Sequence, residues 1–168
     1  MKKNLLLVVV LAFAGITGVF AQAEKYQALF MYNFTRYIEW PSNWTQEFVI
    51  GVVGRSSVYD ELMSIANGKR VGSQTIVIKK FSNASEVAPC QILYVSGEVS
   101  SRVSELATSL QPKNTLIITS RPGLTEKGAG INFVIDDGKQ KFELSRKNVQ
   151  KSGLKVNNQL ADMAMLID

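Results

Sequence analysis

Four segments of strand length, separated by helical patterns, constrain the fold of this chain more than any other feature. They cover residues 48–53, 75–81, 92–95 and 115–119 and are rich in apolar or β-branched residues. The first is continuously apolar, which is typical of a central strand that is buried on both faces, as in parallel sheets. Segments with apolar residues at helical spacing lie between them, for example over residues 58–65 and 99–110. The alternation predicts a central sheet covered by helices.

The pattern changes near the end of the chain. Residues 131–135 and 142–144 alternate between apolar and polar, and Asp137-Gly138 lies between them. This dipeptide is the strongest short signal for a two-residue hairpin, whose strands are antiparallel. Residues 160–167 then carry apolar side chains at helical spacing, with Asn157 or Asn158 as the expected cap.

Together these patterns predict one three-layer α/β domain. Its central sheet is expected to be mixed but mostly parallel, with one antiparallel hairpin near the C-terminus and a C-terminal helix. No repeat, linker or low-complexity segment divides the chain.

The first 23 residues have the pattern of a secretory signal peptide. Lys2 and Lys3 precede an apolar run over residues 5–13, and Ala21-Gln22-Ala23 matches a cleavage site. The apolar run is short for a membrane anchor. We therefore expect cleavage, export to the periplasm and a working domain over residues 24–168 that does not itself span the membrane.

Composition excludes several kinds of site. The chain has no histidine and one cysteine, so it lacks the residues for a histidine-based catalytic triad, a histidine or thiolate zinc site, or an internal disulfide. No catalytic residue, metal ligand or cofactor is predicted. The net charge of +5 is mild and its basic residues are scattered, which argues against nucleic-acid binding.

The first segment after the signal peptide, residues 24–40, is predicted to be a helix that Pro41 stops. Its apolar residues surround most of its circumference, which is typical of a helix buried between layers. The alternative is a docking surface extended by Trp40 and Trp44. In that interpretation the partner-binding residues are Tyr32, Asn33, Tyr37 and Trp40.

The turn after the first apolar run, residues 51–57, resembles an anion cradle. A glycine-bearing turn between a strand and a helix directs free N–H groups at an anion. A charge would come from Arg55 and hydroxyl groups from Ser56 and Ser57, and Ser57 is also expected to cap the helix that follows. Arg121 follows another strand at the same sheet edge. Ordinary turn chemistry is the alternative.

Cys90 also has two interpretations. It is either a buried small apolar residue at the start of a strand, or a thiol that pairs between two chains and so makes a homodimer.

Several segments resemble the YfiR family of periplasmic regulators (YfiR-like, DUF4154-type domain). Residues 28–41 resemble the family's opening helix with its YNF and WP motifs, and residues 48–54 its first strand. Residues 90–96 resemble its Cys-led strand, where a histidine often replaces Gln91. The blocks that resemble its final segments are residues 128–133, 141–144 and 153–156.

The resemblance implies an exported regulatory protein rather than an enzyme. It implies a partner, the periplasmic domain of a membrane signalling protein such as a diguanylate cyclase or a sensor kinase, and a link to cyclic di-GMP and biofilm formation. The family's cysteine pairs are missing, since Cys90 stands alone. The alternative function is a periplasmic module that binds an anionic metabolite through Arg55, Ser56 and Arg121.

Overall fold

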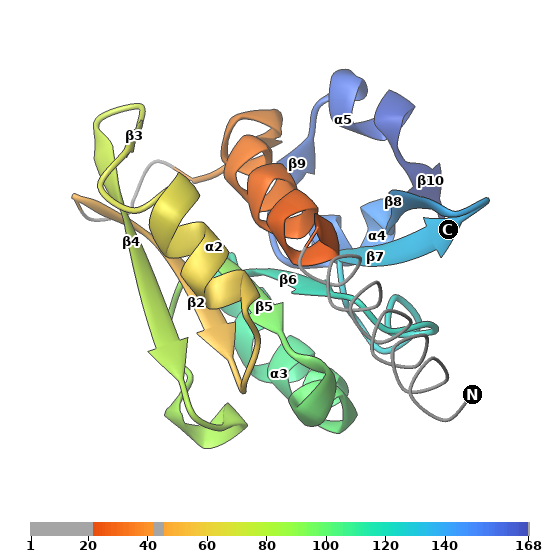
Figure 1. Cartoon of the computed structure of the whole chain (residues 1–168), viewed down its shortest axis with the longest axis horizontal. Coiled ribbons are helices and arrows are strands. Elements are labelled where there is room, and N and C mark those ends of the chain that lie inside the picture. Colours follow the sequence, from red (N-terminus) through yellow and green to blue (C-terminus); the bar gives the residue numbers. More distant parts are fainter. Residues whose placement is uncertain (1–21, 42–45, 168) are drawn as a thin grey trace, which may run out of the picture.

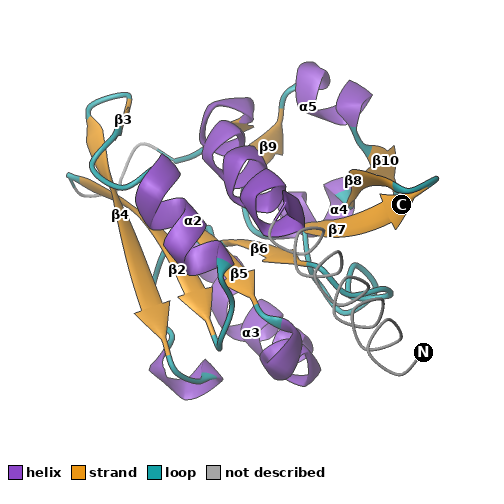
Figure 2. Ribbon diagram, viewed as in Figure 1, coloured by secondary structure: helices purple, strands orange, loops and turns teal. Residues whose placement is uncertain are grey.

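An eight-stranded mixed sheet forms the middle layer of the protein (Figures 1 and 2). The computed structural model describes residues 22–41 and 46–167. The spatial order of the strands is β10-β8-β7-β6-β5-β2-β4-β3. Their bounds are β2 (Glu47–Val53), β3 (Arg70–Val71), β4 (Gln74–Phe81), β5 (Ile92–Val95), β6 (Leu116–Thr119), β7 (Ile131–Asp136), β8 (Lys139–Leu144) and β10 (Met165–Leu166).

The direction of the strands confirms the predicted sheet. Strands β4, β2, β5, β6 and β7 are mutually parallel, whereas β7 and β8 form an antiparallel hairpin. Asp137 and Gly138 both have positive φ, 49° and 69°, as a type I′ turn requires. Because glycine adopts this conformation without steric cost, the dipeptide fixes the register of the hairpin.

The order of the parallel strands creates a crevice at one edge of the sheet. From β2 the chain moves outward to β4, then returns past β2 to β5 and continues to β6 and β7. The connections that leave β2 and β5 therefore run in opposite directions. In open α/β sheets such a reversal leaves a crevice at the carboxyl ends of the two strands, where ligands bind.

Helices cover both faces of the sheet. One face is covered by the helix of residues 22–37, α2 (Val58–Ile65), α4 (Arg146–Lys151) and α5 (Asn158–Met163). The other face is covered by α3 (Val103–Leu110) and the chain around it, which includes the short 3₁₀ helices η1 (Ala84–Glu86), η2 (Gly97–Arg102) and η3 (Gln111–Lys113). Figure 1 shows the red-orange helix of residues 22–37 beside α2.

Aromatic packing joins the first helix to the hairpin. The ring of Phe34 is fully buried and lies 5.3 Å from that of Phe142 and 6.2 Å from that of Phe133, between ring centroids. Phe30 adds a contact of 5.6 Å to Phe142. This packing confirms that the apolar side of the helix belongs to the core.

Two predicted helix ends are wrong. The first helix ends at residue 37 rather than Trp40, because β1 (Ile38–Glu39) pairs in antiparallel fashion with β9 (Lys155–Val156). The last helix ends at Met163, because β10 pairs with β8 and takes the chain into the sheet. In both places backbone pairing between distant segments overrides helical spacing.

The sequence patterns did not predict several short elements. Strands β3 and β9 have two residues each, and α4 has six residues with few apolar ones. Within the described residues, no helix has the length and apolar character needed to cross a bilayer.

Candidate functional site

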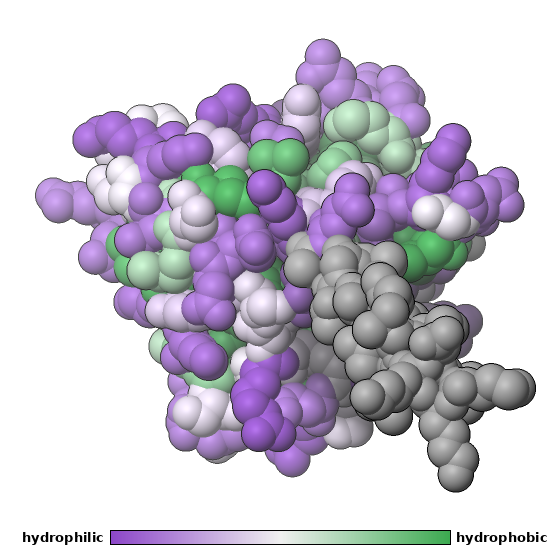
Figure 3. Space-filling view, viewed as in Figure 1, coloured by the Kyte–Doolittle hydropathy of each residue, from purple (hydrophilic) through white to green (hydrophobic). Residues whose placement is uncertain are grey.

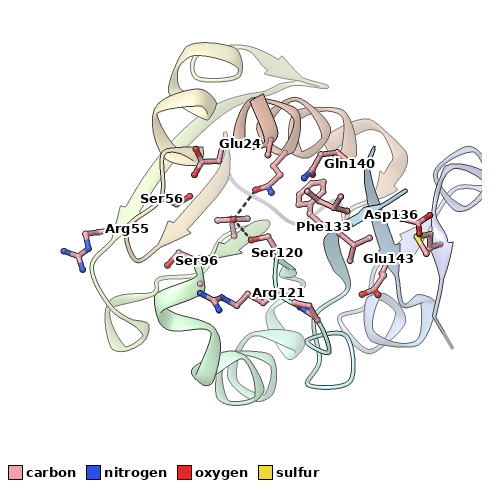
Figure 4. A pocket seen from close by; sticks show the side chains of 18 residues that line it. Glu24, Arg55, Ser56, Ser96, Ser120, Arg121, Phe133, Asp136, Gln140 and Glu143 are labelled. Atoms are coloured by element: carbon pink, nitrogen blue, oxygen red, sulfur yellow. Dashed lines mark hydrogen bonds between the residues drawn. The ribbon is translucent and has the colours of Figure 1, made fainter. Parts of the chain in front are cut away.

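A cavity of about 750 Å³ lies at the carboxyl ends of β2, β5 and β6, where the strand order reverses. We call it the sheet-end cavity. The start of the first helix and the protruding hairpin of β7 and β8 form its other walls. Figure 4 shows the side chains that line it, among them Gln27, Ser56, Tyr94, Ser96, Ser120 and Arg121.

A buried tyrosine forms the floor of the cavity. The Tyr94 hydroxyl, at the end of β5, donates to Oε1 of Gln27 at 3.1 Å and lies 2.8 Å from Oγ of Ser120. Since Tyr94 has one hydroxyl proton, Ser120 donates to Tyr94 when Tyr94 donates to Gln27. Burial raises the pKa of Tyr94 above its ordinary value of 10.0, so the hydroxyl is neutral at pH 7.

Ser96 follows Tyr94 by two residues and has an unpartnered hydroxyl. The residue is 1% exposed, and its Oγ has no hydrogen-bond partner among the described residues. The hydroxyl lies against the backbone of Gly54, where the chain turns with a φ of 81°. A buried polar group without a hydrogen-bond partner destabilises the folded state, so the missing partner of this hydroxyl is unusual.

Arg121 lies over the residue that follows Ser96. Its guanidinium lies over the backbone of Gly97, where an added methyl group would be 2.7 Å from Nε of Arg121. Among the described residues, no hydrogen bond or ion pair holds the Arg121 side chain, which is exposed. In Figure 4 the guanidinium points toward Ser96.

The carboxylates of the cavity, in contrast, all have partners. Glu24 accepts from the Ser57 hydroxyl, and Asp136 accepts from Nζ of Lys141 at 2.5 Å. Glu143 accepts from Nδ2 of Asn132 at 2.9 Å. The unpartnered groups on this wall are therefore a cation and a hydroxyl rather than an acid.

The predicted anion cradle exists only in part. Residues 51–53 belong to β2, where Gly51 makes room for Phe81; a methyl group on Gly51 would lie 2.7 Å from that ring. The backbone N–H of Arg55 is already bonded to Oε1 of Glu98 at 2.5 Å. Nε of Arg55 lies 3.1 Å from Oε2 of the same carboxylate. The Arg55 side chain is held there, and Figure 4 shows it directed out of the cavity.

The two serines of this turn have separate roles. Ser56 lines the cavity, and its Oγ accepts from the backbone N–H of Val58 at 3.2 Å. Ser57 occupies the N-cap position of α2, but its side chain makes no capping hydrogen bond, contrary to prediction. Its backbone is helical rather than extended, and its hydroxyl donates to Glu24 instead. Asn157, in contrast, caps α5 by accepting from the N–H of Leu160, as predicted.

The predicted partner-binding residues of the first helix lie away from the cavity. Tyr32 is covered by two cations, since Cζ of Arg36 and Nζ of Lys69 are 5.1 Å and 4.8 Å from its ring centroid. Asn33 and Tyr37 are partly buried.

Trp40 packs edge-on against Phe48 at 5.1 Å between ring centroids, at the start of β2. It therefore lies at the opposite end of this strand from the cavity. Its buried indole Nε1 has no hydrogen-bond partner among residues 22–41 and 46–167. Trp44 lies outside the described residues, as does the predicted signal peptide up to residue 21.

Cys90 is fully buried beneath β2, which favours the interpretation as a core residue. Burial raises the pKa of its thiol to about 12. Within the described ranges, no three His, Cys, Asp or Glu side chains are grouped so that they could hold a metal ion.

Tyr94 and Ser96 are the polar cavity residues that the sequence did not predict, whereas Ser120 lies in the loop of residues 119–123 that it did indicate. Tyr94 and Ser96 lie at or just after the end of an apolar strand, where parallel strands direct their loops to one edge. Polar residues at that position are a usable signal, but the strand order decides which of these ends become neighbours.

Comparison with known sequences adds one finding. The family profile described as DUF4154, YfiR/HmsC-like, matches residues 24–165. No curated protein matches the chain.

Proposed function

The chain belongs to the YfiR/HmsC-like family, and from this premise we propose that it is an exported regulator that acts through protein contacts rather than as an enzyme. The observation that carries the proposal is the family match, which extends over almost all of the chain after the signal-peptide pattern. The composition supports it, since histidine is absent and the one thiol is buried.

The proposed site of action is the periplasm, and the proposed partner is the periplasmic domain of a membrane signalling enzyme. A diguanylate cyclase is the first candidate and a sensor kinase the second. The basic, apolar and small-residue segments of residues 1–23 support export. By restraining a cyclase, the protein would lower cyclic di-GMP and disfavour biofilm formation.

The surface proposed for docking is the C-terminal segment and the adjoining hairpin, where large apolar side chains are exposed. Exposed apolar groups that gather at one place are typical of interaction sites. Figure 3 shows apolar surface near α5 and β7. The residues of this surface, which we call the C-terminal patch, are Ile135, Met163, Met165, Leu166 and Ile167.

The first helix offers less apolar surface for docking. Most of its apolar side chains pack into the core, and Leu29 is its exposed large apolar residue. The C-terminal patch is therefore the better candidate for the partner's apolar surface, and the residues Tyr32, Asn33, Tyr37 and Trp40 remain a prediction.

A cellular assay tests this function. Expression of the full chain in its native host is expected to lower cyclic di-GMP, and deletion to raise it. The double variant M165K/L166K is expected to abolish the effect, because two charges would have to be desolvated in the interface. Met63→Lys, on the exposed side of α2, is the matched control and is expected to act like the natural protein.

A crosslinking experiment identifies the partner. A photoreactive residue at position 163 is expected to capture a membrane protein that carries a periplasmic domain and a cyclase or kinase domain, whereas the same residue at position 63 is not. If cyclic di-GMP is unchanged by both expression and deletion, and position 163 captures no such protein, the proposed function is wrong.

A further inference from the structure

We propose that the sheet-end cavity binds a small hydroxylated organic anion, with its anionic group held between Arg121 and Ser96. The ligand class is a carboxylate or phosphate ester of a small polyol. The proposal goes beyond partner docking and does not depend on which protein the chain contacts.

The position of the cavity is the first argument. It lies where the connections of β2 and β5 diverge, so the loops at both strand ends leave room for a ligand. Its volume of about 750 Å³ is in the range of small-molecule pockets.

The unpartnered groups define the anionic end. The Ser96 hydroxyl is buried in the cavity wall and has no partner among the described residues. The Arg121 guanidinium reaches the same place over Gly97 and is unpaired in the described part of the chain. A carboxylate or phosphate oxygen would accept hydrogen bonds from both, and bonds to a charged group are the strong ones.

The remaining polar groups define the other end of the ligand. When the Tyr94 hydroxyl donates to Gln27, the Ser120 hydroxyl donates its proton to Tyr94. The oxygen of Ser120 can then accept a hydrogen bond from a ligand. Gln140 also lines the cavity, and its buried Oε1 has no hydrogen-bond partner in the described part of the chain. Acceptors in the cavity wall match the hydroxyl groups of a polyol.

The internal ion pairs explain why Arg121 rather than Arg55 takes this role. Glu98 already neutralises Arg55 and occupies its backbone N–H. Asp136 is paired with Lys141, whereas Glu24 and Glu143 accept from neutral groups, and none of the three forms an ion pair with Arg121 among the described residues. An incoming anion is the partner that this cation lacks.

Binding is tested on protein purified from cells that express the full chain. Thermal unfolding and amide NMR shifts are measured with glycerol 3-phosphate, gluconate, inorganic phosphate, acetate and glycerol as probes. Glycerol 3-phosphate or gluconate is expected to raise Tm and to shift the amides of Ser96 and Ser120, since a ligand that binds the native state stabilises it. Which of the two acts identifies the anionic group.

Three variants test the named residues. Arg121→Ala is expected to weaken binding about tenfold or more, as for the loss of a hydrogen bond to a charged group. Gly97→Ala is expected to weaken it too, since the new methyl group displaces the guanidinium. Arg102→Ala removes the same charge from a neighbouring guanidinium that is paired with Glu105, and is expected to leave binding unchanged.

Ser96→Ala separates a ligand role from a structural one. Because the hydroxyl has no partner in the free protein, its removal is expected to leave Tm unchanged or higher while binding weakens.

The proposal is overturned if neither hydroxylated anion shifts Tm or the amides, or if phosphate, acetate or glycerol acts as strongly. It is also overturned if Arg102→Ala weakens binding as much as Arg121→Ala, or if Ser96→Ala destabilises the free protein. These measurements use the isolated protein, so their failure leaves the proposed regulatory function standing.

Discussion

The carboxylate of Glu98 holds both the backbone N–H and the side chain of Arg55, at 2.5 Å and 3.1 Å. The turn after β2 therefore holds an anionic side chain of the same chain, which is an internal contact of the turn and not a ligand site. This contact holds Arg55 outward, whereas Arg121 has no such partner among the described residues.

The first prediction concerns the pKa of Glu98. The backbone N–H of Arg55 is the largest cause that lowers this pKa below 4.5, ahead of the side chain. We expect Arg55→Ala to leave part of the lowering in place in a carboxyl NMR titration, because the backbone N–H at position 55 remains. For Glu105, whose pKa is lowered chiefly by the side chain of Arg102, Arg102→Ala should remove it. Equal effects of the two variants would contradict this distinction.

The sign of the pH dependence follows from the same shift. A carboxyl whose pKa is lowered on folding stabilises the protein above its unfolded pKa, and this stabilisation is lost as pH falls through the folded pKa. The Glu98 contact should therefore matter at neutral pH and disappear in acid.

The second prediction concerns Cys90. Its pKa of about 12 in the folded state exceeds the value of 9.0 for a free thiol, so above pH 9 the unfolded chain loses a proton that the folded chain keeps. The titration of Cys90 should therefore lower the free energy of unfolding as the pH rises, by at most about 1.4 kcal/mol per pH unit. Urea unfolding across this range should show a shallower fall for Cys90→Ala. The native thiol should also resist thiol reagents, and rapid labelling at pH 8 would contradict its burial.

The third prediction concerns Gln91, whose side chain accepts a hydrogen bond from the backbone of β2. Its Oε1 accepts from the backbone N–H of Val49 at 2.7 Å in the core. Gln91→Met keeps the size of the side chain but leaves this N–H unsatisfied, so we expect a loss of about 1–3 kcal/mol in the free energy of unfolding. Gln159→Met, on the exposed surface of α5, is the control and should change stability little. Equal effects of the two substitutions would mean that the bond is unimportant.

The fourth prediction concerns the first helix. Phe34→Ala should cost about 3–5 kcal/mol, because Phe34 fills the space between the helix and the hairpin. Leu29→Ala, on the exposed side of the same helix, should change stability little, since Leu29 is 46% exposed and alanine favours helices. Denaturant unfolding of both variants compares the two sides of the helix, and a larger loss for Leu29→Ala would contradict the core assignment.

The strongest sequence predictions concerned patterns that need few distant contacts. The segments that form β2, β4, β5 and β6 were placed within a residue or two. Strands β2, β5 and β6 are buried on both faces and therefore nearly continuously apolar, and β4 is marked by its β-branched residues. The Asp137-Gly138 turn followed from backbone conformation alone. The helix ends at residue 37 and Met163 were missed, because β1 and β10 exist only through pairing with distant strands.

The candidate site was predicted less well than the fold. The loops after β2 and β6 do meet at one cavity, which brings Ser56 and Arg121 together as expected. Glu98 lies 43 residues from Arg55, and this spacing does not indicate that the two side chains form an ion pair. The unpartnered state of Ser96 is likewise a property of its surroundings.

The sequence by itself determined which segments form the longer strands, that their sheet is covered on both faces, and which chemistries the missing histidine excludes. Local conformation and hydrophobic periodicity carry that information. Only the tertiary structure decided that β2 lies between β4 and β5, and hence where the crevice opens. It also decided that Arg55 is paired with Glu98 and that Arg121 has no partner among the described residues, because pairing depends on which side chains the folded backbone brings within hydrogen-bond distance.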